Sequence, residues 1–202
     1  PRAERTAGGR KGHGSAVSAN AYVALLRGIN VGGHNKLPMK ILGSMFERAG
    51  CDHVGTYIQS GNVVFTAGAA LAARIPELIK QSITEEFGYE IPIVTRTAGE
   101  LDDIVAANPY VRAGIDRREL HVAFLADQPA AAAIATLDPN RSPPDEFVVH
   151  GCEIYFRCPE GLARTKLSNA YFDSRFTTTS TVRNWKTTLR LAELAAQASG
   201  GR

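Results

Sequence analysis

The hydrophobic pattern of the first half of the chain predicts short strands that alternate with amphipathic helices. A seven-residue apolar run precedes a helix that starts near Pro38 and stops at Gly50. Two further apolar runs flank Ser60-Gly61, which is typical of a hairpin turn. The next amphipathic segment contains Pro76, so it either kinks or begins as a regular helix near Arg74. The predicted elements are, in chain order, a strand over 21–27, a helix over 38–49, strands over 53–59 and 62–67, a helix over 70–87 and a strand over 91–97.

The second half repeats this order after one additional helix. Thr97 and Glu100 have the spacing of a capping box, which predicts a helix that runs to Ala107. The remaining predicted elements are a strand over 119–125, an alanine-rich helix over 129–137, a hairpin over 147–157, a helix over 167–176, a strand over 177–184 and a helix over 185–196. The order of elements therefore predicts an α+β fold of two tandem ferredoxin-like (βαββαβ) plaits with a C-terminal helix. The predicted domains are a disordered basic tail (1–19), a first plait (20–97) and a second plait with the terminal helix (98–202).

Charge is segregated along the 202-residue chain. The net charge of +3 belongs to the tail, which holds four basic residues and one acidic residue, whereas residues 20–202 hold 19 of each sign. Residues 97–160 contain 11 acidic and 5 basic side chains, and residues 161–202 contain 2 acidic and 7 basic ones. The net charge is thus no sign of a general nucleic-acid binder.

The cysteines and histidines argue against a disulfide framework and a metal site. Three cysteines without a CxxC spacing favour reduced thiols and a cytoplasmic setting. Five scattered histidines provide no zinc-binding spacing, and no apolar run reaches the roughly 20 residues of a membrane span. We expect no cofactor, no metal and no membrane partner, and the sequence predicts no oligomeric state.

The glycine-rich loop LLRGINVGGHNK connects the first strand to the first helix. Gly28 and Gly33 have the spacing of a phosphate-binding loop, but Lys36 does not follow the second glycine directly and no hydroxyl residue comes after it. No GxGxxG spacing supports a dinucleotide site either. Positive-φ glycines and an uncapped helix start could still bind an anion through backbone N–H groups. The alternative is that water or Asn35 satisfies these groups and the glycines only turn the chain.

Two other polar clusters are candidates for ligand contact. Gln59, Ser60 and Asn62 surround the predicted hairpin turn, where they could read a ligand or simply form the turn. Arg183, Asn184 and Lys186 lie at a strand-to-helix junction, where they could bind phosphate or carboxylate groups or neutralise the acidic segment 97–160. An RNA-recognition module is unsupported, because the third strand lacks the basic start and the paired aromatic residues of that motif.

Three segments, YVALLRGINVGGHNKLPM, TYIQSGNVVFT and VRNWKTTLRLAEL, together closely resemble the bacterial family called domain of unknown function 1697. The resemblance covers roughly residues 21–196 and implies tandem ferredoxin-like plaits. It transfers no catalytic residue, because no activity is established for that family. This sequence departs from the family at His34, where a lysine is common, and at Pro76.

The sequence leaves three functional hypotheses. The first is a cytoplasmic protein that binds a small anionic or phosphorylated ligand in a cleft between the plaits. The second is an enzyme that acts on such a ligand with a spatially assembled site, and the third is a weak nucleic-acid binder that uses the tail and the C-terminal basic face. The candidate ligand-binding residues are Arg27, Asn30, Lys36, Gln59, Ser60, Asn62, Arg183, Asn184 and Lys186.

Overall fold

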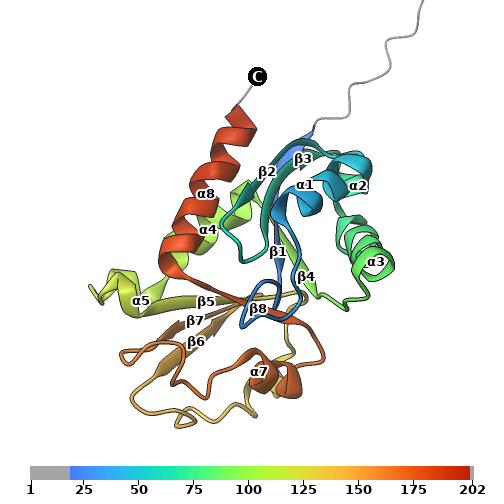
Figure 1. Cartoon of the computed structure of the whole chain (residues 1–202). Helices are drawn as coiled ribbons and strands as arrows, with labels where there is room; N and C mark the ends of the chain where they lie inside the picture. Colours follow the sequence, from blue (N-terminus) through green and yellow to red (C-terminus); the bar gives the residue numbers. More distant parts are fainter. Residues whose placement is uncertain (1–18, 201–202) are drawn as a thin grey trace, which may run out of the picture.

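A computed structural model describes residues 19–200 and contains two four-stranded antiparallel sheets (Figure 1). The predicted N-terminal tail lies, apart from Ala19, outside the described residues. The strands are β1 (Asn20–Leu26), β2 (Asp52–Tyr57), β3 (Asn62–Ala67), β4 (Ile93–Thr97), β5 (Leu120–Leu125), β6 (Glu146–His150), β7 (Glu153–Arg157) and β8 (Ser180–Asn184). The α-helices are α1 (Met39–Arg48), α2 (Ala69–Ala72), α3 (Ile75–Phe87), α4 (Ala98–Ala107), α5 (Pro109–Arg112), α6 (Ala131–Ile134), α7 (Asn169–Arg175) and α8 (Trp185–Gly200).

The two sheets have the same strand order. The first is β2-β3-β1-β4 and the second is β6-β7-β5-β8, with every neighbouring pair antiparallel. The helix over 70–87 that the sequence predicted divides into α2 and α3, because Pro76 lies in the first turn of α3 and lacks the N–H that a continuous helix needs. The predicted capping box of Thr97 and Glu100 at the start of α4 is confirmed.

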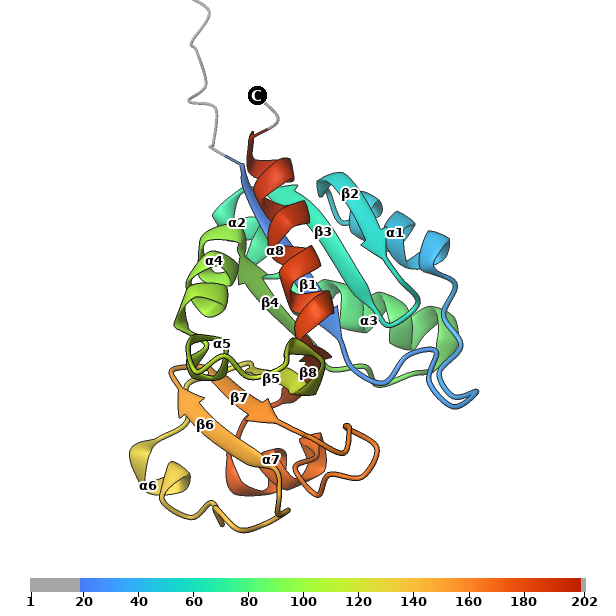
Figure 2. The ribbon, with the colours of Figure 1, turned by 90° about the vertical axis from the view of Figure 1, so that its left-hand side faces the viewer.

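The first sheet is covered on both faces, and one of these coverings is shared with the second sheet (Figures 1 and 2). Helices α1 and α3 pack on one face around Phe46, Phe65 and Ile79, which are all fully buried. Helices α4 and α8 pack on the other face, in a core cluster that also contains Val122 and Phe124 of the second sheet. Helix α8 therefore lies against β1 and β3, although it directly follows β8 in the chain. Helix α7 covers the far face of the second sheet.

The alanine-rich helix predicted over 129–137 is short. Helix α6 has only four residues, and none of them is buried. Alanine has a high helix propensity, but most of a helix's stability in a protein comes from burial of an apolar face. This segment offers only Ile134 and Leu137 for such a face, so a single turn forms.

Candidate functional site

Arg183, the central residue of the predicted anion site, lies in the interior and not in a cleft. Its Nε donates to Oδ1 of Asn62 over 2.6 Å, and its Nη2 donates to the carbonyl oxygens of Leu26, Ser60 and Gly61 over 2.7–3.2 Å. Its Nη1 donates to the carbonyl oxygen of Val182 and to the hydroxyl of the neighbouring Thr181. Burial of the side chain lowers the pKa of Arg183 to about 10. All five N–H groups are used within the protein, so Arg183 has none to offer a ligand.

The hairpin residues near Arg183 also bond within the protein. Asn62 is fully buried, and its Nδ2 donates to the carbonyl oxygen of Tyr57 and to Oγ of Ser60. Gln59 is exposed, and its carbonyl oxygen accepts a hydrogen bond from Asn30. These contacts hold the β2–β3 turn in place, which is the simpler of the two roles that the sequence suggested.

The side chain of Asn30 links the start of the glycine-rich loop to its end through hydrogen bonds. Oδ1 of Asn30 accepts from the N–H of Leu37, and its Nδ2 donates to the carbonyl oxygen of the same residue. Helix α1 begins at Met39, one residue later than predicted, with Pro38 at the cap position and no side-chain cap.

Lys36 is exposed and forms no ion pair within residues 19–200. Arg27 is bound to the carboxylate of Asp173 and to the carbonyl oxygen of Ser180.

At the other predicted cluster, Asn184 caps α8 by accepting from the N–H of Thr187 over 2.8 Å, and Lys186 is exposed. The structure thus brings Ser60, Asn62 and Arg183 into one network beside Arg27. The side chains of Lys36, Gln59 and Lys186 remain on the surface.

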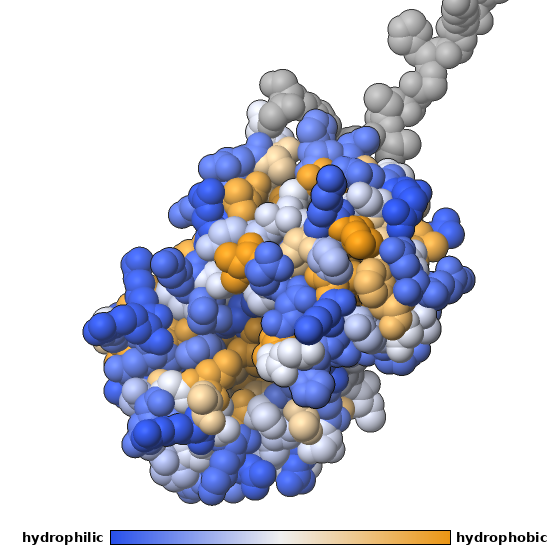
Figure 3. Space-filling model, viewed as in Figure 1, coloured by the Kyte–Doolittle hydropathy of each residue, from blue (hydrophilic) through white to orange (hydrophobic). Residues whose placement is uncertain are grey.

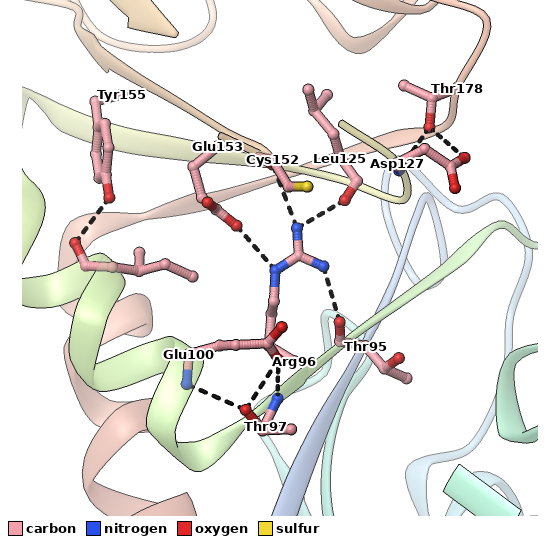
Figure 4. A network of polar contacts seen from close by, with 11 residues as sticks. Thr95, Arg96, Thr97, Glu100, Leu125, Asp127, Cys152, Glu153, Tyr155 and Thr178 are labelled. Atoms are coloured by element: carbon pink, nitrogen blue, oxygen red, sulfur yellow. Dashed lines mark hydrogen bonds and ion pairs between the residues drawn. The ribbon is translucent and has the colours of Figure 1, made fainter. Parts of the chain in front are cut away.

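A second arginine, Arg96 on β4, makes contacts that correspond to those of Arg183. They run from the first half of the chain to the second, whereas those of Arg183 run from the second half to the first (Figure 4). Its Nε donates to Oε1 of Glu153 over 2.9 Å, and its Nη2 donates to the carbonyl oxygens of Leu125 and Cys152 over 2.7 and 3.2 Å. Its Nη1 donates to the carbonyl oxygen of Thr95 over 2.8 Å. Four of its five N–H groups are used, so one N–H of Nη1 has no partner within the described residues.

Each half of the chain therefore receives an arginine from the last strand of the other half. Arg183 reaches the end of β1 and the start of β3, and Arg96 reaches the end of β5 and the start of β7. The backbone repeats the correspondence, because Leu26 donates to Gly61 and Leu125 donates to Cys152, both over 2.8 Å. We call this arrangement the reciprocal arginine lock. The side chain at the start of the strand is Asn62 in one case and Glu153 in the other.

A hollow of about 480 Å³ opens between α4 and the β6–β7 hairpin, beside the Arg96 half of the lock. Its polar lining consists mainly of Arg96, Glu100, Asp103, His150, Cys152 and Glu153. Glu100 and Asp103 are exposed on successive turns of α4, whereas Arg96 and Glu153 are 7% and 8% exposed. The hollow thus has a buried ion pair at one side and two solvated carboxylates at its rim.

The electrostatics of the hollow centre on Glu153. Burial raises the pKa of this carboxyl group, and the Arg96 guanidinium offsets the shift only in part. Burial likewise raises the pKa of the neighbouring Cys152 thiol, so the thiol is not activated as a nucleophile. A carboxyl group with a raised pKa in a hollow is a candidate for ligand contact or proton transfer.

We expect the raised pKa of Glu153 to appear as a pH-dependent stability difference between the protein and its Glu153→Gln variant. The folded state holds this proton more tightly than the unfolded state, whose carboxyl group titrates near the ordinary value of 4.5. Stability from this group is present below pH 4.5 and is lost as the pH rises through the folded-state pKa. Urea unfolding at several pH values should show the native protein losing stability relative to the variant over that window. A constant difference would contradict the shift.

Arg96 and Glu153 were missed by the sequence hypothesis. A signal was present, because both arginines stand one residue before the cap of a helix, in VTRT before α4 and in TVRN before α8. The hollow itself has no sequence signature, since it depends on small side chains such as Ala107 and Ala126 in its wall.

The outer surface in the view of Figure 1 is mainly hydrophilic, with separate apolar patches (Figure 3). Within residues 19–200, no helix has both the length and the apolar character to cross a lipid bilayer.

Comparison with known proteins gives a family and a fold. The solved structure of the conserved bacterial protein SP0830 from Streptococcus pneumoniae is similar, with a TM-score of 0.70 and 21% sequence identity over 88% of this chain and 99% of that chain. Among curated proteins there is no match. The model of the family described as "Protein of unknown function (DUF1697)" matches residues 19–155. The chain therefore belongs to the DUF1697 family.

Proposed function

We propose that the chain is a binding protein for a small molecule, which is held in the hollow between α4 and the β6–β7 hairpin. The observation that carries the proposal is the ion pair of Arg96 and Glu153, which lines the hollow and keeps unused hydrogen-bonding groups. The hollow has a volume of about 480 Å³, which is within the range of small-molecule sites. The fold leaves one N–H of Arg96 and one oxygen of Glu153 without partners in the described residues. Polar groups of this kind orient ligands in otherwise enclosed sites.

We also propose that the two halves of the chain are tandem ferredoxin-like plaits, with the boundary between them near residue 98. The shared strand order and the reciprocal arginine lock support two equivalent halves. A helix follows the first and third strands of each half, although α6 is a single turn. The hollow would then be a cleft between the two plaits, as the sequence predicted, at a position that the sequence did not indicate.

The charges of the lining change the expected ligand. Three carboxylates and one guanidinium face the hollow, and Arg183 is saturated by the protein. Cationic or zwitterionic molecules are therefore better matched to the site than the anionic or phosphorylated ligand predicted from the sequence. The screen below covers both classes.

A thermal-shift screen tests the proposal with amino acids, organic amines, carboxylates, sugar phosphates and nucleotides. A ligand of the folded state raises Tm by mass action, and a concentration of 100 Kd stabilises by about 2.7 kcal/mol. In the Ala107→Leu variant the larger side chain enters the hollow, so we expect any hit to bind at least tenfold more weakly.

Ala106→Leu is the matched control, because Ala106 is an exposed neighbour on the same helix. A hit that binds both variants as tightly as the native protein lies elsewhere on the molecule. If no compound of any class binds, the proposal fails.

An enzyme that acts on the same ligand is the second candidate, and the raised pKa of Glu153 favours it. Turnover of a thermal-shift hit, lost in Glu153→Gln, would support this function.

We place the protein in the cytoplasm as part of the proposal, supported by its three free thiols Cys51, Cys152 and Cys158.

A further inference from the structure

The two halves of the reciprocal arginine lock do the same structural task with different side chains. Oδ1 of Asn62 accepts from Nε of Arg183 over 2.6 Å, and Oε1 of Glu153 accepts from Nε of Arg96 over 2.9 Å. Both acceptors start the third strand of their half, and both residues are buried. The amide shows that the lock does not require a negative charge at this position.

A carboxylate is more costly to bury than an amide, even when it is paired. Glu153 nevertheless occupies a position where a neutral residue suffices for the fold. Its Oε1 is bonded to Arg96, whereas its Oε2 has no hydrogen-bond donor within residues 19–200. This second oxygen is not fully buried, and its residue lines the hollow, so a ligand can reach it.

Neither of the two best-formed hollows of the described residues includes Asn62, and the positions that correspond in sequence to the small wall residues are larger in that half. Ala107 lies ten residues beyond the cap of α4, and Leu194 lies ten residues beyond the cap of α8. Likewise Ala126 follows β5 directly, whereas Arg27 follows β1. The half of the lock that carries the charge is thus also the half with small residues in its wall.

The acidic and basic groups that line the hollow together with Glu153 come from three elements. Helix α4 contributes Glu100 and Asp103, β4 contributes Arg96, and the β6–β7 hairpin contributes His150. The fixed charges of this set sum to −2 when His150 is neutral. The one guanidinium is already held by Glu153 and by three carbonyl oxygens.

We infer that the ligand of the hollow carries a protonated amine, which donates a hydrogen bond to Oε2 of Glu153 while Asp103 attracts it at the rim. This inference rests on the proposed function, because it names the ligand class of the same hollow. The carboxylate at position 153 is thereby assigned to ligand binding in addition to its part in the lock.

Three compounds of equal chain length test the inference on the full chain. Butane-1,4-diamine is a cation, butane-1,4-diol is neutral and succinate is an anion. We expect the diamine alone to raise Tm, with its binding measured by calorimetry. Glu153→Gln keeps an acceptor for Arg96 and removes the charge, and it should weaken diamine binding at least tenfold. Asp103→Asn, a change at an exposed residue that leaves the fold intact, should weaken it severalfold.

Glu119→Gln is the matched control, because Glu119 pairs with Arg157 outside the hollow and its loss should leave diamine binding unchanged. The inference is overturned if the diamine does not bind. It is also overturned if Glu153→Gln and Asp103→Asn both bind the diamine as tightly as the native protein does. If an anionic or neutral compound of the larger screen then binds and is weakened by Ala107→Leu, the proposed function stands without the amine. If nothing binds in the hollow, both fall.

Discussion

Replacement of Arg183 by methionine is expected to lower the free energy of unfolding by about 3–5 kcal/mol, because it leaves a buried set of acceptors without their donor. Asn62 and the carbonyl oxygens of Leu26 and Ser60 lose hydrogen bonds that water cannot replace in the interior. For a chain of this length the loss corresponds to a fall in Tm of about 6–20 °C. Urea and thermal unfolding followed by circular dichroism measure both quantities.

Lys186→Met provides the matched control for this substitution. Lys186 is exposed three residues further along the chain, so its replacement should change stability by no more than about 0.5 kcal/mol. Arg27→Met should fall between the two, because the ion pair of Arg27 with Asp173 is partly solvated. Equal stability of Arg183→Met and Lys186→Met would show that the lock contributes nothing to the fold.

The second large effect is expected for Gly61→Ala. Gly61 has a φ of 75°, and a Cβ atom at this position would lie 2.7 Å from Cβ of Leu26 and 3.0 Å from Ile29. Its carbonyl oxygen also accepts from Leu26 and Arg183, so a backbone shift that relieves the clash would disturb the lock. We expect a loss of about 2–5 kcal/mol in urea unfolding, from positive-φ strain and overpacking together.

Gly28→Ala isolates the steric part of this effect. Gly28 has nearly the same φ, 74°, but a Cβ atom there would meet no atom within 4 Å. Its replacement should cost only the conformational strain, about 1–2 kcal/mol. If both variants lose the same stability, the close approach of Gly61 to Leu26 is unimportant.

The strands and most helices could be predicted from the sequence because their burial follows simple periods. The strand over 62–67 has the predicted bounds, and the helical break near Pro76 follows from the missing N–H of proline. The length of α6 could not be predicted from propensity, because it depends on how little apolar surface this segment buries.

The candidate site was only partly predictable, for a different reason. The sequence identified Arg183 as a cation at a strand-to-helix junction, but three of its six acceptors are backbone carbonyl oxygens about 120 or more residues away. Backbone acceptors leave no mark in the sequence, so an arginine that binds a ligand and one that binds the chain look the same. Arg96 stands at the same place before a helix cap, but three of its four acceptors are likewise backbone carbonyl oxygens, and the hollow beside it depends on side chains that are small.

The packing of α8 sets an order of events during synthesis. The ribosome releases β1 to β4 long before residues 185–200, which together with α4 cover one face of the sheet that those strands form. Arg183, which ties the end of β1 to the start of β3, also emerges late. The nascent N-terminal half must therefore wait with part of an apolar face uncovered, and exposed apolar surface of this kind favours aggregation and chaperone binding.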